Sequence, residues 1–305
     1  MNLGTEICGI PLASPVLNGS GTYDALAAQR AFGSAVIDDF PFAAFVSKTI
    51  TFEPRAGNPP HRLWATPAGM INSIGLPNPG LEGFLAGDLN RLVELPVPLI
   101  VSVMASSAEH FIELVEGVSA VEGVAGIELN VSCPNVHSGL IVGEQPDETL
   151  ALMDKLRPRT PLPLIVKLTP NVANPDRIAV AAEEGGADAV SLINTVKAAG
   201  IDPNHNRTWL GVGAGGLSGP AVRPIALAQT RTVSSAVQIP VIGMGGITDG
   251  ESALEFILAG ATVIAVGTEN FRDPAAGNAV RDGLGAALAR RGFDSLAAAQ
   301  TSTLS

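Results

Sequence analysis

Cys133 stands in a polar turn that directly follows an apolar run of this chain. The stretch reads Glu128-Leu-Asn-Val-Ser-Cys-Pro-Asn135, and Cys8 is the only other cysteine among 305 residues. Free cysteine is usually buried as a small hydrophobe, but Cys133 lacks the apolar neighbours of a core position. A thiol in such a place could work as a nucleophile or as a general base. Two distant cysteines exclude a disulfide scaffold and fit a reducing compartment.

Two lysines, Lys48 and Lys167, end apolar runs, where an unpaired charge carries a heavy desolvation cost. They either bind a ligand or form buried ion pairs. Gly243-Met-Gly-Gly246 and Val266-Gly-Thr268 could hold a phosphate with backbone amides, although such glycines can also simply permit turns. Neither fits the dinucleotide fingerprint, so we expect no NAD site on this chain. Four histidines and two cysteines without ligand spacing predict no metal site.

These residues must be positioned by short apolar runs that alternate with stretches long enough for a helix. Each run ends in polar or glycine residues, and barrel enzymes build their sites from the loops at that end. The pattern predicts an α/β fold, a (β/α)8 TIM barrel in a single domain over residues 1–305. Long βα-loop insertions are expected at 49–95 and 196–220, over the carboxyl-terminal face. The expected strands are residues 15–18, 43–48, 98–103, 126–131, 163–168, 187–194, 239–243 and 262–267, and the helices include 108–118, 147–156, 176–184, 221–233 and 252–258.

Composition and charge limit the class of ligand. The chain is 46% hydrophobic and 15% charged, with a net charge of −11, so its long-range field repels nucleic acid and anionic membranes. An anionic ligand must therefore be captured by local cations and backbone amides. No stretch of about 20 apolar residues and no secretory leader are apparent, so we expect a soluble, cytoplasmic protein that binds no nucleic acid and no membrane.

Seven motifs, in order along nearly the whole chain, resemble the class 1 dihydroorotate dehydrogenases. A cysteine in the third motif, where class 2 enzymes carry serine, indicates class 1, and the last two motifs look most like the NAD-linked class 1B catalytic subunit. The motifs are Ser47-Lys-Thr49, Ile71-Asn-Ser-Ile-Gly-Leu-Pro-Asn78, Leu129-Asn-Val-Ser-Cys-Pro-Asn135, Val166-Lys-Leu-Thr-Pro-Asn171, Ile193-Asn-Thr195, Gly215-Gly-Leu-Ser-Gly-Pro220 and Ile242-Gly-Met-Gly-Gly-Ile247.

The resemblance implies one FMN per chain and oxidation of (S)-dihydroorotate to orotate in pyrimidine (UMP) synthesis. Cys133 matches the base that takes the C5 proton, while hydride passes from C6 to flavin N5. Lys48 matches a lysine that reaches flavin and substrate, and Lys167 one that stabilises the reduced flavin. The implied substrate residues are Lys48, Asn72, Ser73, Ile74, Gly75, Leu76, Asn130, Asn194 and Thr195. The implied FMN residues are Ser20, Gly21, Thr22, Lys48, Thr49, Ser102, Asn130, Lys167, Ile193, Gly219, Gly245, Gly246, Gly267 and Thr268.

Three points stay open at this stage. The segment bracketed by Gly139 and Gly143 is either a lid over the site or an ordinary surface loop. Ser102 and Met104 depart from the 1B pattern, and the serine resembles the fumarate-reducing class 1A. A 1B enzyme would form a homodimer, or a heterotetramer with a separate subunit carrying FAD and a [2Fe–2S] cluster, which passes electrons to NAD⁺. Nothing in this chain could ligate such a cluster.

Other FMN barrels, such as dihydropyrimidine dehydrogenase or dihydrouridine synthase, would share the phosphate turns and a base cysteine. A dihydrouridine synthase would also need a basic RNA-binding surface, which the net charge of −11 contradicts. A non-flavin barrel for a sugar phosphate would share only the glycine turns. A non-catalytic assembly subunit would have lost a lysine or the cysteine, and both lysines and Cys133 are present.

Overall fold

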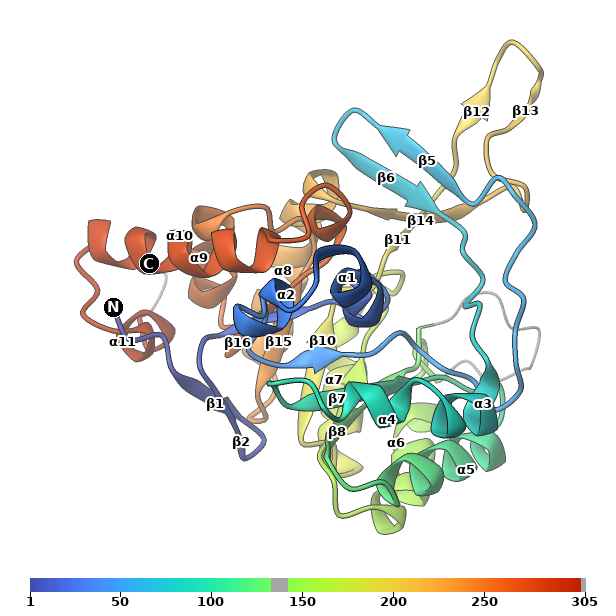
Figure 1. Ribbon diagram of the computed structural model, residues 1–305, viewed down its shortest axis with the longest axis horizontal. Helices are drawn as coiled ribbons and strands as arrows, with labels where there is room; N and C mark the ends of the chain where they lie inside the picture. Colours follow the sequence, from blue (N-terminus) through green and yellow to red (C-terminus); the bar gives the residue numbers. More distant parts are fainter. Residues whose placement is uncertain (133–141, 303–305) are drawn as a thin grey trace.

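The structure is a computed structural model and describes residues 1–132 and 142–302. Its centre is a sheet of eight parallel strands in the order β3-β16-β15-β10-β9-β8-β7-β4 (Figure 1). Each run predicted from the sequence overlaps one of these strands, and the predicted (β/α)8 barrel is confirmed. The strands are β3 (Val16–Asn18), β4 (Phe45–Val46), β7 (Leu99–Val103), β8 (Val124–Asn130), β9 (Leu164–Lys167), β10 (Ala189–Leu192), β15 (Val241–Met244) and β16 (Val263–Val266).

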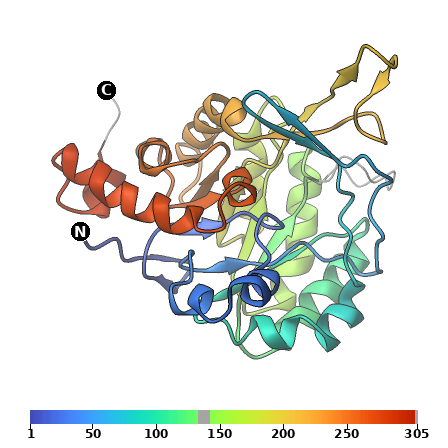
Figure 2. The same cartoon turned by 45° about the horizontal axis from the view of Figure 1, so that its top comes forward.

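Amphipathic helices surround the barrel (Figure 2). Helix α5 begins where Ser107 caps it by accepting a hydrogen bond from His110 N, and it buries apolar residues at helical spacing, from Phe111 to Val118. Predicted helix positions agree within a few residues. The outer helices are α1 (Ala25–Phe32), α2 (Ala35–Asp38), α5 (Ala108–Ser119), α6 (Pro146–Leu156), α7 (Pro175–Glu184), α8 (Arg223–Ser234), α9 (Gly250–Leu258), α10 (Ala276–Arg290) and α11 (Leu296–Gln300), with short 3₁₀ turns η1 (Arg157–Arg159), η2 (Pro220–Val222) and η3 (Thr268–Phe271).

The two long insertions fold against each other. They form a four-stranded antiparallel sheet in the order β11-β14-β6-β5, so segments about 145 residues apart in sequence share one ladder. Figure 1 shows this sheet and the protruding β12–β13 hairpin on one side of the barrel. The insertions contain β5 (Leu63–Thr66), β6 (Gly69–Asn72), α3 (Gly80–Ala86), α4 (Leu89–Leu92), β11 (Val196–Ala198), β12 (Ile201–Asp202), β13 (Arg207–Thr208) and β14 (Gly215–Ser218).

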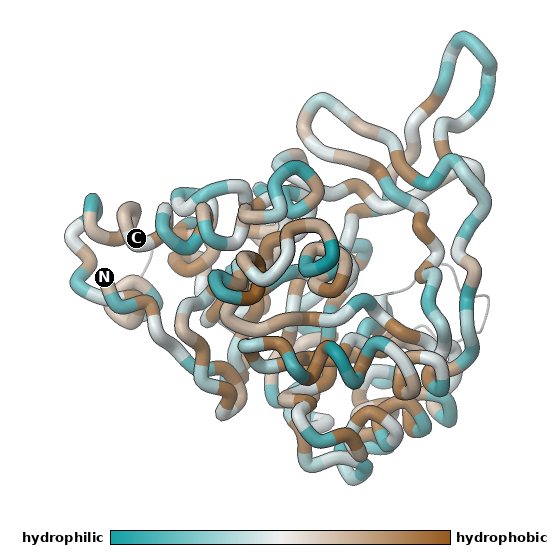
Figure 3. The backbone as a smooth tube through the Cα atoms, in the orientation of Figure 1, coloured by the Kyte–Doolittle hydropathy of each residue, from teal (hydrophilic) through white to brown (hydrophobic). Residues whose placement is uncertain are grey.

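The opposite end of the barrel carries a hairpin of β1 (Thr5–Ile7) and β2 (Ile10–Leu12). Its turn, Cys8-Gly9, has positive φ at both residues, as a two-residue hairpin turn of type I′ requires. Ile7 and Ile10 pack with inward residues of the strands, such as Ile100 and Ile165. In Figure 3, hydrophobic residues, coloured brown, are concentrated in the barrel, and the tip of the β12–β13 hairpin is hydrophilic, coloured teal. Within the described ranges, no helix is long and apolar enough to cross a membrane.

Candidate active site at the carboxyl ends of the strands

A cleft of about 320 Å³ opens at the carboxyl ends of the barrel strands. This volume lies at the lower end of the range for small-molecule and cofactor sites. Eighteen of the residues predicted for substrate or cofactor line it, although they come from distant parts of the sequence. They are Ser20, Gly21, Thr22, Lys48, Thr49, Asn72, Ile74, Leu76, Asn130, Lys167, Ile193, Asn194, Thr195, Gly219, Gly245, Gly246, Gly267 and Thr268.

A second cavity of about 240 Å³ continues outward from the cleft and shares its asparagines. Ser73 and Gly75, both predicted to bind substrate, lie here rather than in the cleft itself. The buried hydroxyl of Ser73 has no hydrogen-bond partner among the described residues. Arg55 and Lys197 also line this cavity, and they place two cations beside it in a chain of net charge −11. The local charge therefore favours an anionic ligand that the molecule as a whole repels.

The amides in the cleft are bonded to one another. Asn130 Oδ1 accepts hydrogen bonds from Ser132 Oγ at 2.8 Å and from Asn194 Nδ2 at 3.3 Å. Asn194 Nδ2 also donates to Ser132 Oγ, while Asn194 Oδ1 accepts from Thr195 N at 2.8 Å. Asn72 Nδ2 donates to Gly216 O of β14 at 3.3 Å. These contacts hold the side chains in place before any ligand arrives, which is the preorganisation that specific recognition needs.

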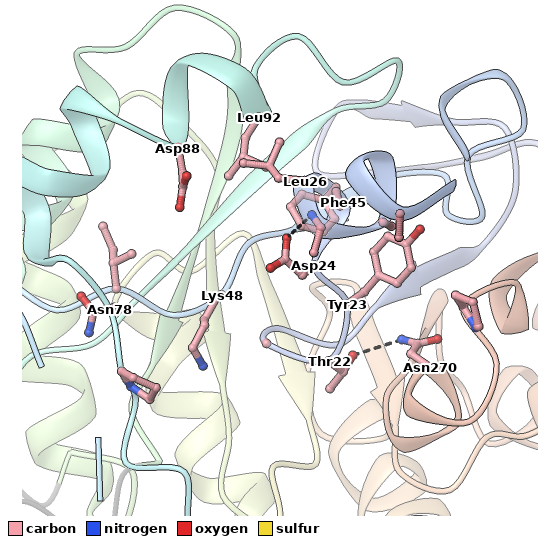
Figure 4. Close-up of a pocket in the computed structure, with 18 of the residues that line it drawn as sticks. Thr22, Tyr23, Asp24, Leu26, Phe45, Lys48, Asn78, Asp88, Leu92 and Asn270 are labelled. Atoms are coloured by element: carbon pink, nitrogen blue, oxygen red, sulfur yellow. Dashed lines mark hydrogen bonds between the residues drawn. The ribbon is translucent and has the colours of Figure 1, made fainter. Parts of the chain in front are cut away.

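Lys48 follows β4 and lies between this cleft and a third, more apolar cavity of about 590 Å³. Figure 4 shows Lys48 between Asn78 and Thr22, and it shows the hydrogen bond of 3.1 Å in which Asn270 Nδ2 donates to Thr22 Oγ1. The side chain is open to the cavities, yet protein atoms surround it. This desolvation lowers the pKa of the Lys48 ammonium below its ordinary value of 10.5.

Lys167 has a partner inside the barrel. Its Nζ lies 3.7 Å from Glu128 Oε1, and both side chains are buried. The alternative that a strand-end lysine forms a buried ion pair is therefore correct for Lys167, which nevertheless also lines the cleft. Among the described residues, the structure gives Lys48 no such ion pair. The two lysines thus differ: Lys167 is held by a carboxylate, and Lys48 is available to a ligand.

Ser102, a predicted flavin contact, lies beneath the cleft rather than on its wall. It is fully buried, its Oγ is 2.9 Å from Thr49 Oγ1, and it donates to Glu128 Oε1 at 3.1 Å. Thr49 Oγ1 is in turn 3.0 Å from Ser20 Oγ. Ser102 therefore reaches the cleft through other residues: directly through Thr49, and through Glu128 to Lys167.

The glycine turns after β14, β15 and β16 meet at one part of the cleft. Gly219 and Gly246 have φ of 94° and 79°, values that favour glycine. A Cβ on Gly246 would lie 2.8 Å from Gly219 O, and one on Gly219 would lie 3.5 Å from Thr268 Cγ2. The backbones after β14 and β15 thus lie close together, with the Thr268 side chain of the third turn beside them, an arrangement that suits a phosphate group.

The predicted base, Cys133, and the segment from Gly139 to residue 141 lie outside the described residues, so their roles stay predictions. In the described ranges no three His, Cys, Asp or Glu side chains are close enough together to hold a metal ion.

Several residues of these cavities were not predicted from the sequence. Met70, Leu217 and Met244 form apolar walls of the cleft, and isolated apolar residues carry no signal that separates a wall from a core position. Arg55 and Lys197 lie in the two insertions, whose pairing no local pattern indicates. Glu128 could have been found from the sequence, because a carboxylate inside an apolar strand indicates a buried polar partner.

The fold and the site define an α/β barrel with a cleft at the carboxyl ends of its strands that is lined by lysines, amides and glycine turns. Comparison with known proteins gives the family. The family model "Dihydroorotate dehydrogenase" matches residues 2–288. The chain belongs to the dihydroorotate dehydrogenase family.

Individual relatives cover nearly the whole chain. A protein of Desulforudis audaxviator named dihydroorotate dehydrogenase B (NAD(+)), catalytic subunit, is 46% identical over 291 residues, which are 94% of this chain and 92% of the relative. One of Caldicellulosiruptor bescii with the same name is 43% identical over 300 residues, 97% of each chain. A third, of Solibacter usitatus, provisionally named dihydroorotate dehydrogenase A (fumarate), is 43% identical over 295 residues, 95% of each chain.

Proposed function

We propose that this chain oxidises (S)-dihydroorotate to orotate, with FMN bound in the cleft, and that it passes the electrons to a separate subunit and on to NAD⁺. One observation carries the proposal: a single cleft, in a member of this family, combines the glycine turns, two lysines and the amides of Asn72, Asn130 and Asn194. The names of the relatives from Desulforudis and Caldicellulosiruptor support NAD⁺ as the final acceptor.

The residues of the cleft fit FMN. The bare backbone of Gly219, Gly246 and Gly267 suits its phosphate, and Lys167 lies where a cation could stabilise negative charge on a bound ring. Ser20 and Thr49 offer hydroxyls in the same cleft. Bound FMN would supply an acceptor for the two electrons and the hydrogen that leave C6 of the substrate.

The chain's own residues bind and orient the substrate. The asparagine amides can match the alternating donors and acceptors of a pyrimidine ring. The ammonium of Lys48, in the cleft, and the Ser73 residue of the adjoining cavity can bind its carboxylate. We assign the removal of the C5 proton to the thiolate of Cys133. Loss of that proton and of hydride from C6 leaves the C5=C6 double bond of orotate.

Anaerobic titration tests this function. The purified protein, reconstituted with FMN, should be yellow, and its flavin absorbance should bleach when dihydroorotate is added. Cys133→Ser should keep the bound FMN but slow the bleaching by about 10²-fold or more, because a hydroxyl is a far weaker base than a thiolate. Cys8→Ser is the matched control and should bleach at the normal rate. A yellow protein that dihydroorotate does not bleach would exclude the substrate, and a colourless one would exclude the cofactor.

The electron acceptor needs its own assay. A fumarate-reducing enzyme is the second candidate, because the Solibacter relative carries that name and Ser102 resembles class 1A. We expect the chain alone to turn over poorly with both NAD⁺ and fumarate, and to use NAD⁺ once an FAD and [2Fe–2S] subunit is added. Rapid turnover of the isolated chain with fumarate would instead favour the second candidate. Size-exclusion chromatography would separate a homodimer from a heterotetramer with that subunit.

A further inference from the structure

Glu128 is a buried carboxylate at the centre of the polar network beneath the cleft. It is 2% exposed, and it has three partners: Ser102 donates to Oε1 at 3.1 Å, Ser191 donates to Oε2 at 3.1 Å, and Lys167 Nζ lies 3.7 Å away. In the sheet register, Ser102 is opposite Glu128, and Ser191 is opposite Lys167. The four form a polar layer above inward apolar residues such as Ile100.

Such a layer is costly for folding. Replacing a buried ion pair by well-packed hydrophobic residues is often neutral or stabilising, so its presence favours a role other than stability. The side chains of Glu128 and Asn130 alternate with those of Leu129 along β8, so both point to the same side of the strand. Asn130 lines the cleft, two residues beyond Glu128.

The carboxylate determines the direction of the hydrogen bonds around it. An ionised carboxylate only accepts, and a serine hydroxyl has one hydrogen to donate. Ser102 donates that hydrogen to Glu128, so Ser102 Oγ must accept from Thr49, which lies 2.9 Å away. Thr49 has then used its own hydrogen, and its oxygen can only accept from any further partner.

Two further groups lie near this oxygen. Ser20 Oγ is 3.0 Å away but donates its own hydrogen to Ser47 O, so the remaining donor is Asn130. Its Nδ2 lies 3.5 Å from Thr49 Oγ1 and donates to it, while its Oδ1 faces the donors of Ser132 and Asn194. If the Asn130 amide turned over, its carbonyl would face a threonine oxygen with no hydrogen left, and its NH₂ would face the donors of Ser132 and Asn194. Only one orientation therefore satisfies the network.

We infer that Glu128 is a positioning residue, which acts through Ser102 and Thr49 to fix the amide orientation of Asn130 and so the donor–acceptor pattern that the cleft offers a pyrimidine ring. The inference rests on the proposed function, since it assigns to Asn130 a ligand with alternating donors and acceptors. A ligand edge that matches one orientation of the Asn130 amide would, in the other orientation, place a donor against a donor and an acceptor against an acceptor. Each polar group left unpaired in this way would cost binding free energy.

Two serine variants form a matched test. Ser102→Ala and Ser191→Ala each remove one hydrogen bond of 3.1 Å to Glu128 from a fully buried residue. Only Ser102 connects the carboxylate to Thr49. We expect Ser102→Ala to raise the Kd of orotate about tenfold, and Ser191→Ala to change it less than twofold. Orotate binding would be followed by the perturbation of the flavin spectrum, and FMN binding by quenching of FMN fluorescence, without turnover.

Glu128→Gln provides a third variant. Its amide can donate to Ser102, which then donates to Thr49 and reverses the chain, so we expect a loss of orotate affinity similar to that of Ser102→Ala. Thermal unfolding of each apo-protein checks the fold. Equal Kd values for orotate in Ser102→Ala and Ser191→Ala would overturn the inference. Failure of the proposed function would look different, because the unmodified protein would then bind no FMN or no orotate.

Discussion

Cys8 lies in surroundings that suppress the reactivity of its thiol. Cys8 donates a hydrogen bond to Asp188 O at 3.3 Å, just before β10 begins, so it lies at the end of the barrel opposite to the cleft. Burial, and to a smaller extent the negative charges of Asp188 and Glu6, raise the pKa of the Cys8 thiol from 9.0 to about 12. Because the thiolate is the reactive form, Cys8 should be inert near neutral pH.

We therefore expect a thiol reagent at pH 7.5 to modify one cysteine rapidly in the folded protein, and that cysteine to be Cys133. The thiolate fraction of Cys8 is about a thousandfold below that of an ordinary cysteine, given the pKa of about 12. Mass spectrometry after labelling would identify the site. Cys8→Ser should leave the rapid phase intact, Cys133→Ser should abolish it, and rapid labelling of Cys8 would contradict the prediction.

Lys48 combines a cost in stability with a predicted role in binding. Desolvation lowers its pKa in the folded state, so the unfolded chain binds more protons over the interval between that pKa and 10.5. Stability therefore rises with pH across this interval, and below it the folded protein bears the full cost of the partly desolvated charge. A group that destabilises the free protein in this way is typical of a binding site.

We expect Lys48→Met to make the apo-protein more stable at pH 7, with a difference that disappears above pH 10.5. The same variant should slow flavin reduction by dihydroorotate by about 10²-fold, the usual effect of losing one preorganised electrostatic group. Thermal unfolding at several pH values and anaerobic stopped-flow measure the two effects. Lys155→Met, at an exposed position of α6, is the control. A variant with lower stability and normal reduction would show that Lys48 is structural.

At the scale of elements, local patterns predicted the barrel strands and the outer helices but not the sheet of the insertions. The runs of the barrel are short, apolar and bounded by turns, and their spacing alone indicates the βα repeat. Strands β6 and β14 carry glycines and polar residues, and each is stabilised by a partner far away in sequence. Their pairing, and the way it brings Asn72 to Gly216, depends on tertiary contacts that no local pattern contains.

The insertions are also joined by the two tryptophans of the chain. The rings of Trp64 and Trp209 stack with centroids 3.8 Å apart and an angle of 10°, which fixes the loop before β14 against β5. Such a stack adds about 1 kcal/mol beyond the buried area. It holds β14 beside β6, and β14 accepts the hydrogen bond of Asn72.

We expect Trp209→Ala to increase amide hydrogen exchange in residues 196–218 and to weaken orotate binding several-fold, while the barrel strands keep their protection. The reason is that the insertion sheet lies outside the barrel core and can open locally. Ile201→Ala, at an exposed position of the same segment, is the matched control. Unchanged exchange in residues 196–218 would mean that the stack does not hold the sheet.

At the scale of the whole molecule, the barrel closes through a side chain. The parallel ladder ends at β3 and β4, and their seam is bridged by the amide of Asn18, which is fully buried. Its Nδ2 donates to Val46 O at 2.8 Å and its Oδ1 accepts from Val46 N at 2.9 Å, so the side chain replaces a peptide group of a neighbouring strand. The sequence indicated a polar residue at this strand end but could not separate this structural role from ligand binding.

We expect Asn18→Ala to lower the free energy of unfolding by roughly 2–6 kcal/mol, because both backbone groups of Val46 lose their partner in a dry interior and each costs about 1–3 kcal/mol. Asn18→Asp should also destabilise, since a carboxylate cannot donate to Val46 O and would face it with negative charge. Urea unfolding measures the change, with Asn90→Ala as the control for an exposed amide bonded to a carbonyl. The seam lies next to Ser20 and Gly21, so FMN affinity should fall together with stability. If Asn18→Ala unfolded at the same urea concentration as the unmodified protein, the seam would have to be closed by backbone contacts such as Ala43 N to Val16 O alone.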